Sequence, residues 1–522
     1  MKNALIVIAS ALLFAGCGSS NKTTSENSKP KAAANPVDYA STITSAELKE
    51  MLYTYASDEF EGRETGAPGQ KKAVNYLKDQ YIAMGIPSPL PGDTYFQDVP
   101  LQKQKTPDVE FSVGDTTFEN FDDFLVSGSV QTQKLDITEV VYAGYGIDSE
   151  NYSDYDGLDV KDKIVLIKAG EPKDSDGNYL SSGSNLDTKW SNGRQSVSSK
   201  RDAAEAKGAK ALLFLYPELL EQYGAYYKQL ELSSNSGRMS LKSNDIPMIS
   251  MLISNAVAEA IYPEIQTADQ PKVLTTGFTI NITSKTEEVA SENVVAFIKG
   301  SEKPDEILVI SAHLDHEGIK NGEVYNGADD DGSGTIAILE IAEAFKQAEK
   351  DGYAPKRSIL FLHVTGEEKG LLGSRHYSDN DPIFPLKNTV ADLNIDMIGR
   401  TDPEREGDRN YIYLIGSDKL STELHTISEE VNSKYMNITL DYKYNDDNDP
   451  NRFYYRSDHY NFAKNNIPVI FYFNGTHADY HQPSDTPDKI QYDLLENRAR
   501  LVFYTAWELA NRNDRITVDK AQ

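Results

Sequence analysis

The hydrophobic positions of the C-terminal half fall into short apolar runs separated by segments with helical spacing. The runs have the length of buried strands, and they lie at residues 294–298, 307–311, 357–364, 390–395, 411–415 and 467–473. Residues 334–348 and 492–511 carry apolar side chains at helical spacing. Strands that alternate with helices indicate a sheet covered by helices. We therefore expect an α/β fold with a mixed, mostly parallel sheet flanked by helices.

Two earlier segments have a different character. Residues 45–81 show helical spacing on either side of a glycine-rich loop at 60–69, which carries Glu61, Arg63 and Glu64. The loop is either the rim of a site or a plain helix–helix connection. Strand patterns at 140–146, 163–168, 209–215 and 246–250, with a helical segment at 200–207, predict a β-rich unit over residues 126–284. The alternative is that this region belongs to one larger sheet.

The N-terminus is typical of a secreted protein. A basic start, Met1-Lys2, precedes an apolar run at 4–14 that is too short to span a membrane comfortably. The run ends at Cys17 in a sequence that resembles a bacterial lipobox, whose cysteine is lipidated; an ordinary signal peptide with a chance cysteine is the alternative. We expect a lipoprotein signal peptide at 1–17, a flexible tether at 18–38, and a lipid anchor on Cys17 that holds the protein in a bacterial cell envelope.

The totals narrow the classes of partner and site. A formal net charge of −29 argues against nucleic acid and anionic membrane surfaces, because the long-range field repels both. Cys17 is the only cysteine, so an intrachain disulfide is excluded. All eight histidines lie between His313 and His481, which points to a site in the C-terminal half.

Candidate site residues follow the predicted strands, where ligands gather in sheets of this kind. His313 and Asp315 come after the run at 307–311, and at this spacing in extended backbone the Asp315 carboxylate can reach and orient the His313 ring. Asp329, Asp330 and Asp331 precede the helix at 334–348. Three adjacent carboxylates repel one another unless a cation neutralises them or they cap the helix.

Further carboxylates and histidines complete the pattern. Glu367 and Glu368 follow the strand at 357–364, and one of them could bind a metal ion while the other serves as a general base. Asp396 ends the strand at 390–395. His477 and His481 have the spacing of a zinc-binding helix, but the glycine and proline around them predict a loop and the glutamate of that motif is missing.

Taken together, His313, Asp330, Glu368, Asp396 and His481 supply two histidines and three carboxylates. Two Zn²⁺ ions that share a bridging aspartate and keep open positions for water would use this set. A structural zinc site is the competing interpretation, but such sites are usually closed by cysteines.

With these motifs, the sequence resembles the co-catalytic di-zinc exopeptidases that include bacterial leucyl aminopeptidase, glutamate carboxypeptidase and the transferrin receptor ectodomain. Matching segments run from Glu61 to Thr486. The resemblance implies a zinc peptidase domain at 39–125 and 285–522 and an inserted protease-associated domain at 126–284, where Asp154-Tyr-Asp-Gly157 matches. The segment Arg456-Ser-Asp-His-Tyr460 matches a further family motif that lines the site.

The resemblance also implies roles for single residues. His313 and Asp396 would bind one zinc, Glu368 and His481 the other, and Asp330 would bridge them. Glu367 would be the general base and Asp315 would orient His313. His316 and His477 are neighbours of ligands and receive no role.

The function implied is an extracytoplasmic aminopeptidase that removes N-terminal residues from peptides. A carboxypeptidase or dipeptidase of the same family is the second interpretation, because arginines lie near the motifs. A glutaminyl cyclase, with a single zinc, fits the five ligands less well. A lipid-anchored binding protein with a structural metal site is the alternative from a different class. The sequence does not determine the oligomeric state.

Overall fold

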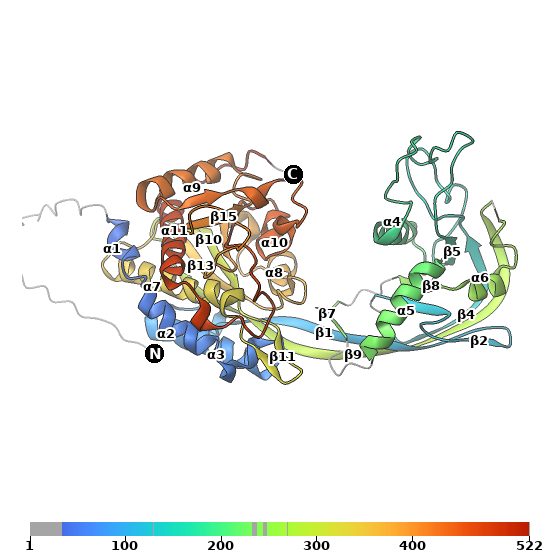
Figure 1. The fold of residues 1–522 in the computed structure, drawn as a ribbon, viewed down its shortest axis with the longest axis horizontal. Coiled ribbons are helices and arrows are strands. Elements are labelled where there is room, and N and C mark those ends of the chain that lie inside the picture. The colour runs from blue at the N-terminus through green and yellow to red at the C-terminus, as the bar shows by residue number, and fades with distance from the viewer. Residues whose placement is uncertain (1–33, 129, 232–236, 244–247, 269, 521–522) are drawn as a thin grey trace, which may run out of the picture. The chain divides into compact units, whose positions relative to one another are not determined.

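The computed structural model describes residues 34–128, 130–231, 237–243, 248–268 and 270–520 (Figure 1). The C-terminal part of the chain forms a sheet in the order β16-β15-β17-β14-β10-β13-β9. Its strands are β9 (Lys272–Ile298), β10 (Lys303–His313), β13 (Arg357–Val364), β14 (Thr389–Ile395), β15 (Tyr411–Ile415), β16 (Thr439–Asp441) and β17 (Val469–Phe473). Only the β13–β9 and β15–β17 pairs in this series are antiparallel, so the predicted mixed, mostly parallel sheet is confirmed.

Helices cover both faces of this sheet, because successive residues of a strand point to opposite faces. Val309 packs in one cluster with Tyr377 and Phe462, whereas helices α7 and α11 contact β10 and each other (Figure 1). The helices of this part of the chain are α1 (Pro36–Ala40), α2 (Ser45–Tyr55), α3 (Pro68–Met84), α7 (Gly334–Lys350), α8 (Leu372–Arg375), α9 (Thr422–Tyr435), α10 (His459–Ala463) and α11 (Tyr492–Asn511). The predicted helices at 334–348 and 492–511 correspond to α7 and α11; α9 was not predicted.

The strands of the 126–284 region pair onward from β9 in the order β4-β5-β6-β8-β3. This region and the segment before it contain β1 (Phe96–Val113), β2 (Thr116–Phe118), β3 (Phe124–Ser127), β4 (Gln133–Tyr142), β5 (Ile164–Lys168), β6 (Ala211–Leu215), β7 (Arg238–Leu241), β8 (Ile249–Ile253), α4 (Gly193–Ala206), α5 (Pro217–Glu231) and α6 (Asn255–Ile261). Strand β9 runs without interruption past residue 284. The assignment of 126–284 to the protease-associated family, and its boundaries, stay predictions.

Two long strands differ from the sequence-based expectation. The apolar pattern of β1 falls into two stretches, 95–101 and 109–113, that by themselves predict two strands, whereas β1 covers both, with a register shift against β9 between Lys105 and Asp108. Strand β9 was predicted only at 294–298. Residues 283–290 of this strand are all exposed or half-buried, so they carry little hydrophobic signal, and pairing with β1 holds them extended.

The N-terminal predictions at 1–17, including Cys17, lie outside the described residues. The predicted tether at 18–38 is wrong at its end, because Pro36 begins helix α1. Tyr39 of this helix stacks on Trp507 of α11, at 5.6 Å between ring centroids. In the described part of the chain, no helix is both long and apolar enough to cross a membrane.

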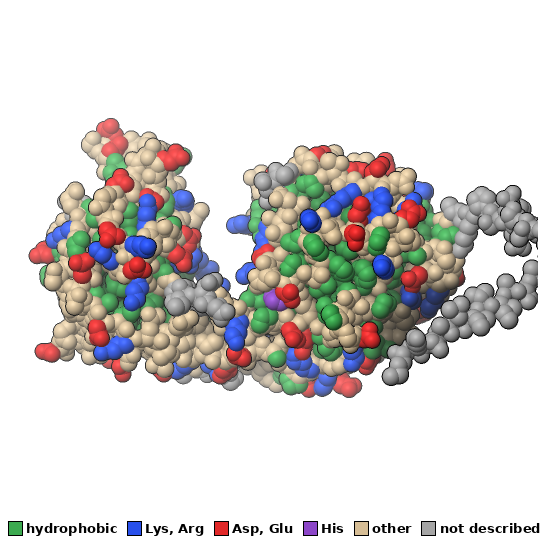
Figure 2. All heavy atoms as spheres, turned by 180° about the vertical axis from the view of Figure 1, so that it is seen from behind, with side chains coloured by type: hydrophobic (Ala, Val, Ile, Leu, Met, Phe, Trp, Pro, Cys, Tyr) green, Lys and Arg blue, Asp and Glu red, His purple; other side chains and the backbone are tan. Residues whose placement is uncertain are grey.

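Acidic and basic side chains are interspersed on the face of the molecule that Figure 2 shows. Many of them form exposed pairs, such as Lys228 with Asp122 and Arg409 with Asp493. Exposed pairs contribute little to stability.

Candidate metal centre

The carboxyl ends of three neighbouring strands bring the candidate residues together. Strand β10 lies between β13 and β14 and is parallel to both. His313 is the last residue of β10, Glu367 and Glu368 follow β13, and Asp396 follows β14. Carboxyl ends of parallel strands lie at one edge of a sheet, so these four side chains converge, as the sequence predicts. His481 joins them from the loop after β17.

The turn Ala328–Ser333, which contains a cis peptide bond between Asp330 and Asp331, gives its three aspartates different partners. The Asp329 carboxylate accepts from the Gly399 amide at 2.6 Å. The Asp331 carboxylate accepts from the Gly334 and Met397 amides at 2.9 and 3.1 Å. Of the three, Asp330 is the one that faces His313 and His481, so the two outer aspartates stabilise the turn and the middle one is left for the site.

Asp330 lies at the centre of the cluster, with one oxygen towards each of two histidines. Its Oδ1 lies 3.1 Å from Nε2 of His313, and its Oδ2 lies 3.0 Å from Nε2 of His481. His313 Nε2 is also 3.6 Å from Asp396 Oδ1, and His481 Nε2 is 3.1 Å from Glu368 Oε2. His313 and Asp396 thus lie on one side of Asp330, and His481 and Glu368 on the other.

The donor atoms of this cluster suit a metal ion. His313 Nε2, Asp330 Oδ2 and Glu368 Oε1 are buried and have no hydrogen-bond partner among the described residues. Buried polar atoms are almost always paired, so several orphans at one point indicate a missing ligand. His313, Asp330 and Asp396 have donor atoms within 4.8 Å of one another, a spacing that a single ion could bridge. Imidazole and carboxylate donors without a thiol match catalytic zinc sites better than structural ones.

The cluster changes the pKa values of its own members. Burial raises the pKa of Glu368, but the neighbouring histidines outweigh it and hold the value at about 2. Burial lowers the pKa of His481, but Asp330 and Glu368 raise it to about 10. Burial also raises the pKa of Asp330, but the neighbouring histidines outweigh this effect, so the value lies well below its usual range. Without a cation, the carboxylates of Asp330 and Glu368 are therefore ionised and the His481 ring carries a proton.

The prediction that the Asp315 carboxylate contacts the His313 ring is wrong. The His313 ring is held through Nδ1 by the backbone carbonyl of Asp315, at 3.0 Å. The Asp315 carboxylate instead accepts from the Thr65 hydroxyl at 2.6 Å and from the Glu367 amide at 3.2 Å. The expected side-chain contact is wrong because the strand β10 ends at His313, so the next residues no longer alternate as in a strand. Asp315 thus fixes the backbone of Glu367.

Glu367 lines a small cavity of about 30 Å³ beside Asp330 and Asp396. The rest of its wall is formed by aromatic and polar side chains, namely Phe453, Phe471, Phe473, Thr476, Tyr480 and Arg456, together with Met397. Burial, together with the charges of Glu368 and Asp396, raises the pKa of Glu367 well above its usual range, although His313 lowers it. A carboxyl group with a raised pKa in such a place can hold and transfer a proton.

Sequence reasoning assigned no role to two histidines that the structure places at the cluster. His316 Nδ1 lies 2.8 Å from Glu368 Oε1 and belongs to a second possible ligand group, with Asp330 and Glu368. His477 contacts Asp329 instead, at 3.1 Å, and so stabilises the aspartate turn. Thr65 was also missed; the position of His316, next to Asp315, was the only available signal.

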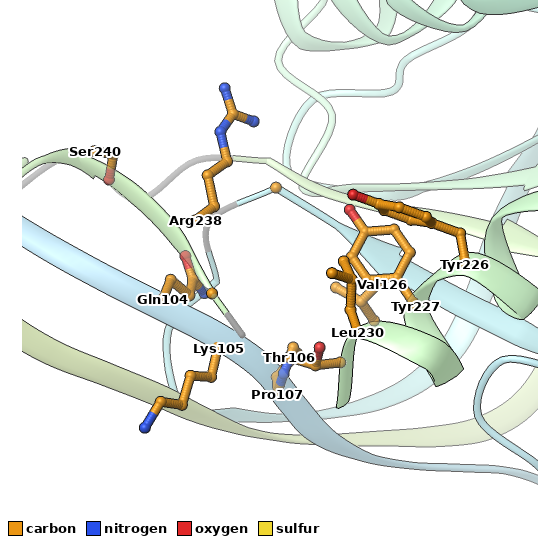
Figure 3. Close-up of a pocket in the computed structure, with 12 residues that line it drawn as sticks. Gln104, Lys105, Thr106, Pro107, Val126, Tyr226, Tyr227, Leu230, Arg238 and Ser240 are labelled. Atoms are coloured by element: carbon orange, nitrogen blue, oxygen red, sulfur yellow. The ribbon is translucent and has the colours of Figure 1, made fainter. Parts of the chain in front are cut away.

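A second cavity, of about 360 Å³, lies in the 126–284 region and the neighbouring β1 strand (Figure 3). Tyr226, Tyr227 and Leu230 of α5 form its apolar side, and Lys105 and Arg238 are its charged residues. Its described lining includes no carboxylate, imidazole or thiol, the side chains that most often bind metal ions in proteins.

The chain is similar to known peptidases over the region that contains the site. Residues 293–506, which include every residue of the cluster, match the model of Peptidase family M28. The chain is 31% identical over 161 residues to the probable glutamate carboxypeptidase LAMP1 of Arabidopsis thaliana, covering 30% of this chain and 23% of that protein. It is 24% identical over 405 residues to the aminopeptidase YwaD of Bacillus subtilis, covering 76% of this chain and 72% of that protein.

Among solved structures, an aminopeptidase from Aneurinibacillus sp. strain AM-1 shows 19% identity and a TM-score of 0.49, covering 93% of this chain and 98% of that one.

Proposed function

We propose that this protein is a zinc-dependent aminopeptidase that holds two zinc ions in the Asp330-centred cluster. The placement of Asp330 carries the proposal, because its two oxygens face His313 on one side and His481 on the other. His313 and Asp396 would hold one ion, and Glu368 and His481 the other. Zinc, when bound, polarises a carbonyl oxygen and lowers the pKa of water.

The residues around the cluster supply the acid–base chemistry. Glu367 faces the cavity beside Asp396 and would take a proton from the attacking water and return it to the nitrogen of the departing amine. The Asp315 carboxylate holds the Glu367 amide, so the base is fixed relative to His313. Phe453, Phe471 and Phe473 exclude water from the cavity and offer an apolar surface to a substrate side chain.

One observation favours an aminopeptidase over a carboxypeptidase. The relative named as an aminopeptidase aligns over 76% of this chain, whereas the one named as a probable glutamate carboxypeptidase aligns over 30%. Arg456 in the cavity that Glu367 lines could bind an α-carboxylate, which keeps a carboxypeptidase or dipeptidase as the second candidate.

The test combines elemental analysis with two matched peptides, one with a free N-terminus and one N-acetylated. We expect about two zinc ions per chain, loss of activity with a chelator, and cleavage of the free-amine peptide alone. Cleavage of both peptides would indicate a carboxypeptidase. One tightly bound zinc and no cleavage would contradict the two-ion centre.

We further propose that the protein acts outside the cytoplasm, anchored by a lipid on Cys17. The apolar run at 4–14 followed by the chain's only cysteine supports this location. Labelling with radioactive palmitate in a bacterial host should mark the wild type and not the Cys17→Ser variant. Equal labelling of both would contradict the anchor.

A further inference from the structure

The described part of the chain places a third histidine, His316, against the two carboxylates that His481 also contacts. His316 Nδ1 lies 2.8 Å from Glu368 Oε1 and 3.7 Å from Asp330 Oδ2. We propose that His316 is a further metal ligand, on the ion held by Asp330 and Glu368. This inference rests on the proposed metal centre and adds to it a third imidazole.

The spacing of the donor atoms matches one shared ion. Zinc lies about 2.1 Å from nitrogen and oxygen ligands, so two ligand atoms in a tetrahedral site are about 3.4 Å apart. The two distances from His316 Nδ1, 2.8 and 3.7 Å, lie on either side of this value. The donor atoms of His316, Asp330 and Glu368 all lie within 4.8 Å of one another, as those of His313, Asp330 and Asp396 do.

The burial of the His316 ring also indicates a bound ion. In the described part of the chain neither ring nitrogen has a hydrogen-bond partner, although the side chain is fully buried and Nδ1 lies 2.8 Å from Glu368 Oε1. A buried imidazole without partners is costly unless a ligand completes it. The orphaned nitrogen nearest the carboxylates, Nδ1, is the one that a metal ion would use.

The surrounding structure holds the ring against the cluster. A Cβ atom on Gly327 would lie 2.5 Å from two carbons of the His316 ring, so the glycine lets the ring approach the aspartate turn. The ring meets the His481 ring edge to face, at 5.6 Å between centroids. The His316 amide also donates to the Arg63 carbonyl at 3.3 Å. These contacts fix His316 before any ion binds.

The competing role for His316 is a charged hydrogen-bond partner that orients Glu368 without touching metal. The two roles differ in the number of imidazoles bound. In protein loaded with Co²⁺, each coordinated histidine gives one exchangeable ring N–H resonance with a large paramagnetic shift. We expect three such resonances in the wild type, from His313, His316 and His481, and two in the His316→Gln variant. Two resonances in the wild type would overturn the proposal.

Metal affinity provides a second measurement. Loss of an outer hydrogen-bond partner typically weakens metal binding about 10- to 100-fold, so loss of a direct ligand should weaken one of the two ions by more than about 100-fold. Chelator competition on His316→Gln measures this. His425→Gln is the control, because His425 lies in α9, contacts Ser417 and is outside the cluster. Two ions bound as tightly in His316→Gln as in the control would also overturn the proposal.

Failure of the proposed function looks different. Wild-type protein that binds no zinc would contradict the proposed metal centre itself. Two tightly bound zinc ions with only two coordinated histidines would contradict the role of His316 alone. If His316→Gln does not fold, the resonance count in the wild type still decides the question.

Discussion

The guanidinium of Arg63 donates a hydrogen bond to the backbone carbonyl of Gly327 at 2.8 Å. Arg63 is 1% exposed and also donates to the carbonyls of Leu314 and Asn326, at 3.1 and 2.7 Å. It thereby joins the loop before α3 to the two segments that carry His313 and Asp330. The loop that sequence alone left as either rim or connection is thus a buried support for the site.

Replacing Arg63 should destabilise the fold. Arg63→Lys removes the planar set of donors and leaves buried carbonyls unpaired, which we expect to cost about 3 kcal/mol of the free energy of unfolding. Urea denaturation measures the change. Arg201→Lys is the control, because Arg201 is exposed and its partner among the described residues is its neighbour Asp202. Equal midpoints for the two variants would show that the Arg63 hydrogen bonds are dispensable.

Glu367→Gln should lower turnover by at least about 100-fold, because the amide cannot accept and return a proton. The zinc content should stay near that of the wild type, since Glu367 is not among the proposed ligands. Steady-state kinetics and elemental analysis on the same preparation give both values. Loss of zinc in this variant would mean that Glu367 and Glu368 have been assigned the wrong way round.

Thr65→Val should reduce turnover by about 10-fold. The fold should be retained, because valine has nearly the shape of threonine. The variant removes the hydroxyl that donates to Asp315, whose other oxygen accepts from the Glu367 amide. Comparison of kcat for Thr65→Val and Thr65→Ser measures the effect. The serine variant keeps the hydroxyl and should stay near wild type; equal losses in both would point to packing.

Zinc binding should release protons at neutral pH. The pKa of His481 is raised to about 10, after the carboxylates overcome the effect of burial, and that of His313 is raised well above its usual range. Both rings are therefore protonated in the metal-free protein, whereas zinc requires neutral imidazoles. We expect about two protons released per chain at pH 7, measured by calorimetry in buffers of different ionisation enthalpy.

The same shifts set the stability of the metal-free protein. The pKa of His481 is higher in the folded than in the unfolded protein, so the protonated ring stabilises the fold. This contribution to the free energy of unfolding is fully present below the unfolded pKa, near 6.5, and is lost as the pH rises to about 10. Metal-free protein should therefore lose stability between pH 6.5 and 10, while zinc affinity rises over this range. Denaturation of the metal-free protein at several pH values measures this loss. These protonation states would be contradicted if the heat of zinc binding did not depend on the buffer, or if the free energy of unfolding did not change with pH.

Gly334→Ala should destabilise the protein by about 1 to 3 kcal/mol through overpacking. A Cβ atom at Gly334 would lie 2.4 Å from Asp331 Oδ1 and 2.6 Å from the Ile395 carbonyl, at the start of α7. Gly277→Ala is the matched control, because a Cβ atom there meets no other atom within 4 Å. Thermal unfolding compares the two variants; the same melting temperature for both would show that the aspartate turn adjusts freely.

The C-terminal sheet could be predicted from sequence because its strands are buried on both faces. Strands β10, β13, β14, β15 and β17 are therefore short apolar runs bounded by polar residues. Helix α9 and residues 283–290 of β9 could not be predicted in this way. Each has an exposed face, and pairing with β1 decides the conformation of β9 over residues whose side chains point to solvent.

For the site, the order of residues along the chain specifies which side chains are available: carboxylates and imidazoles that follow buried strands. Parallel strands bring such residues to one edge, so the convergence of His313, Glu368 and Asp396 follows from their positions in the chain. The folded structure sets which atoms of these side chains meet. It turned Asp315 away from the His313 ring and brought His316 against Glu368, because both residues lie beyond the end of β10, where the alternation of a strand no longer fixes the direction of a side chain.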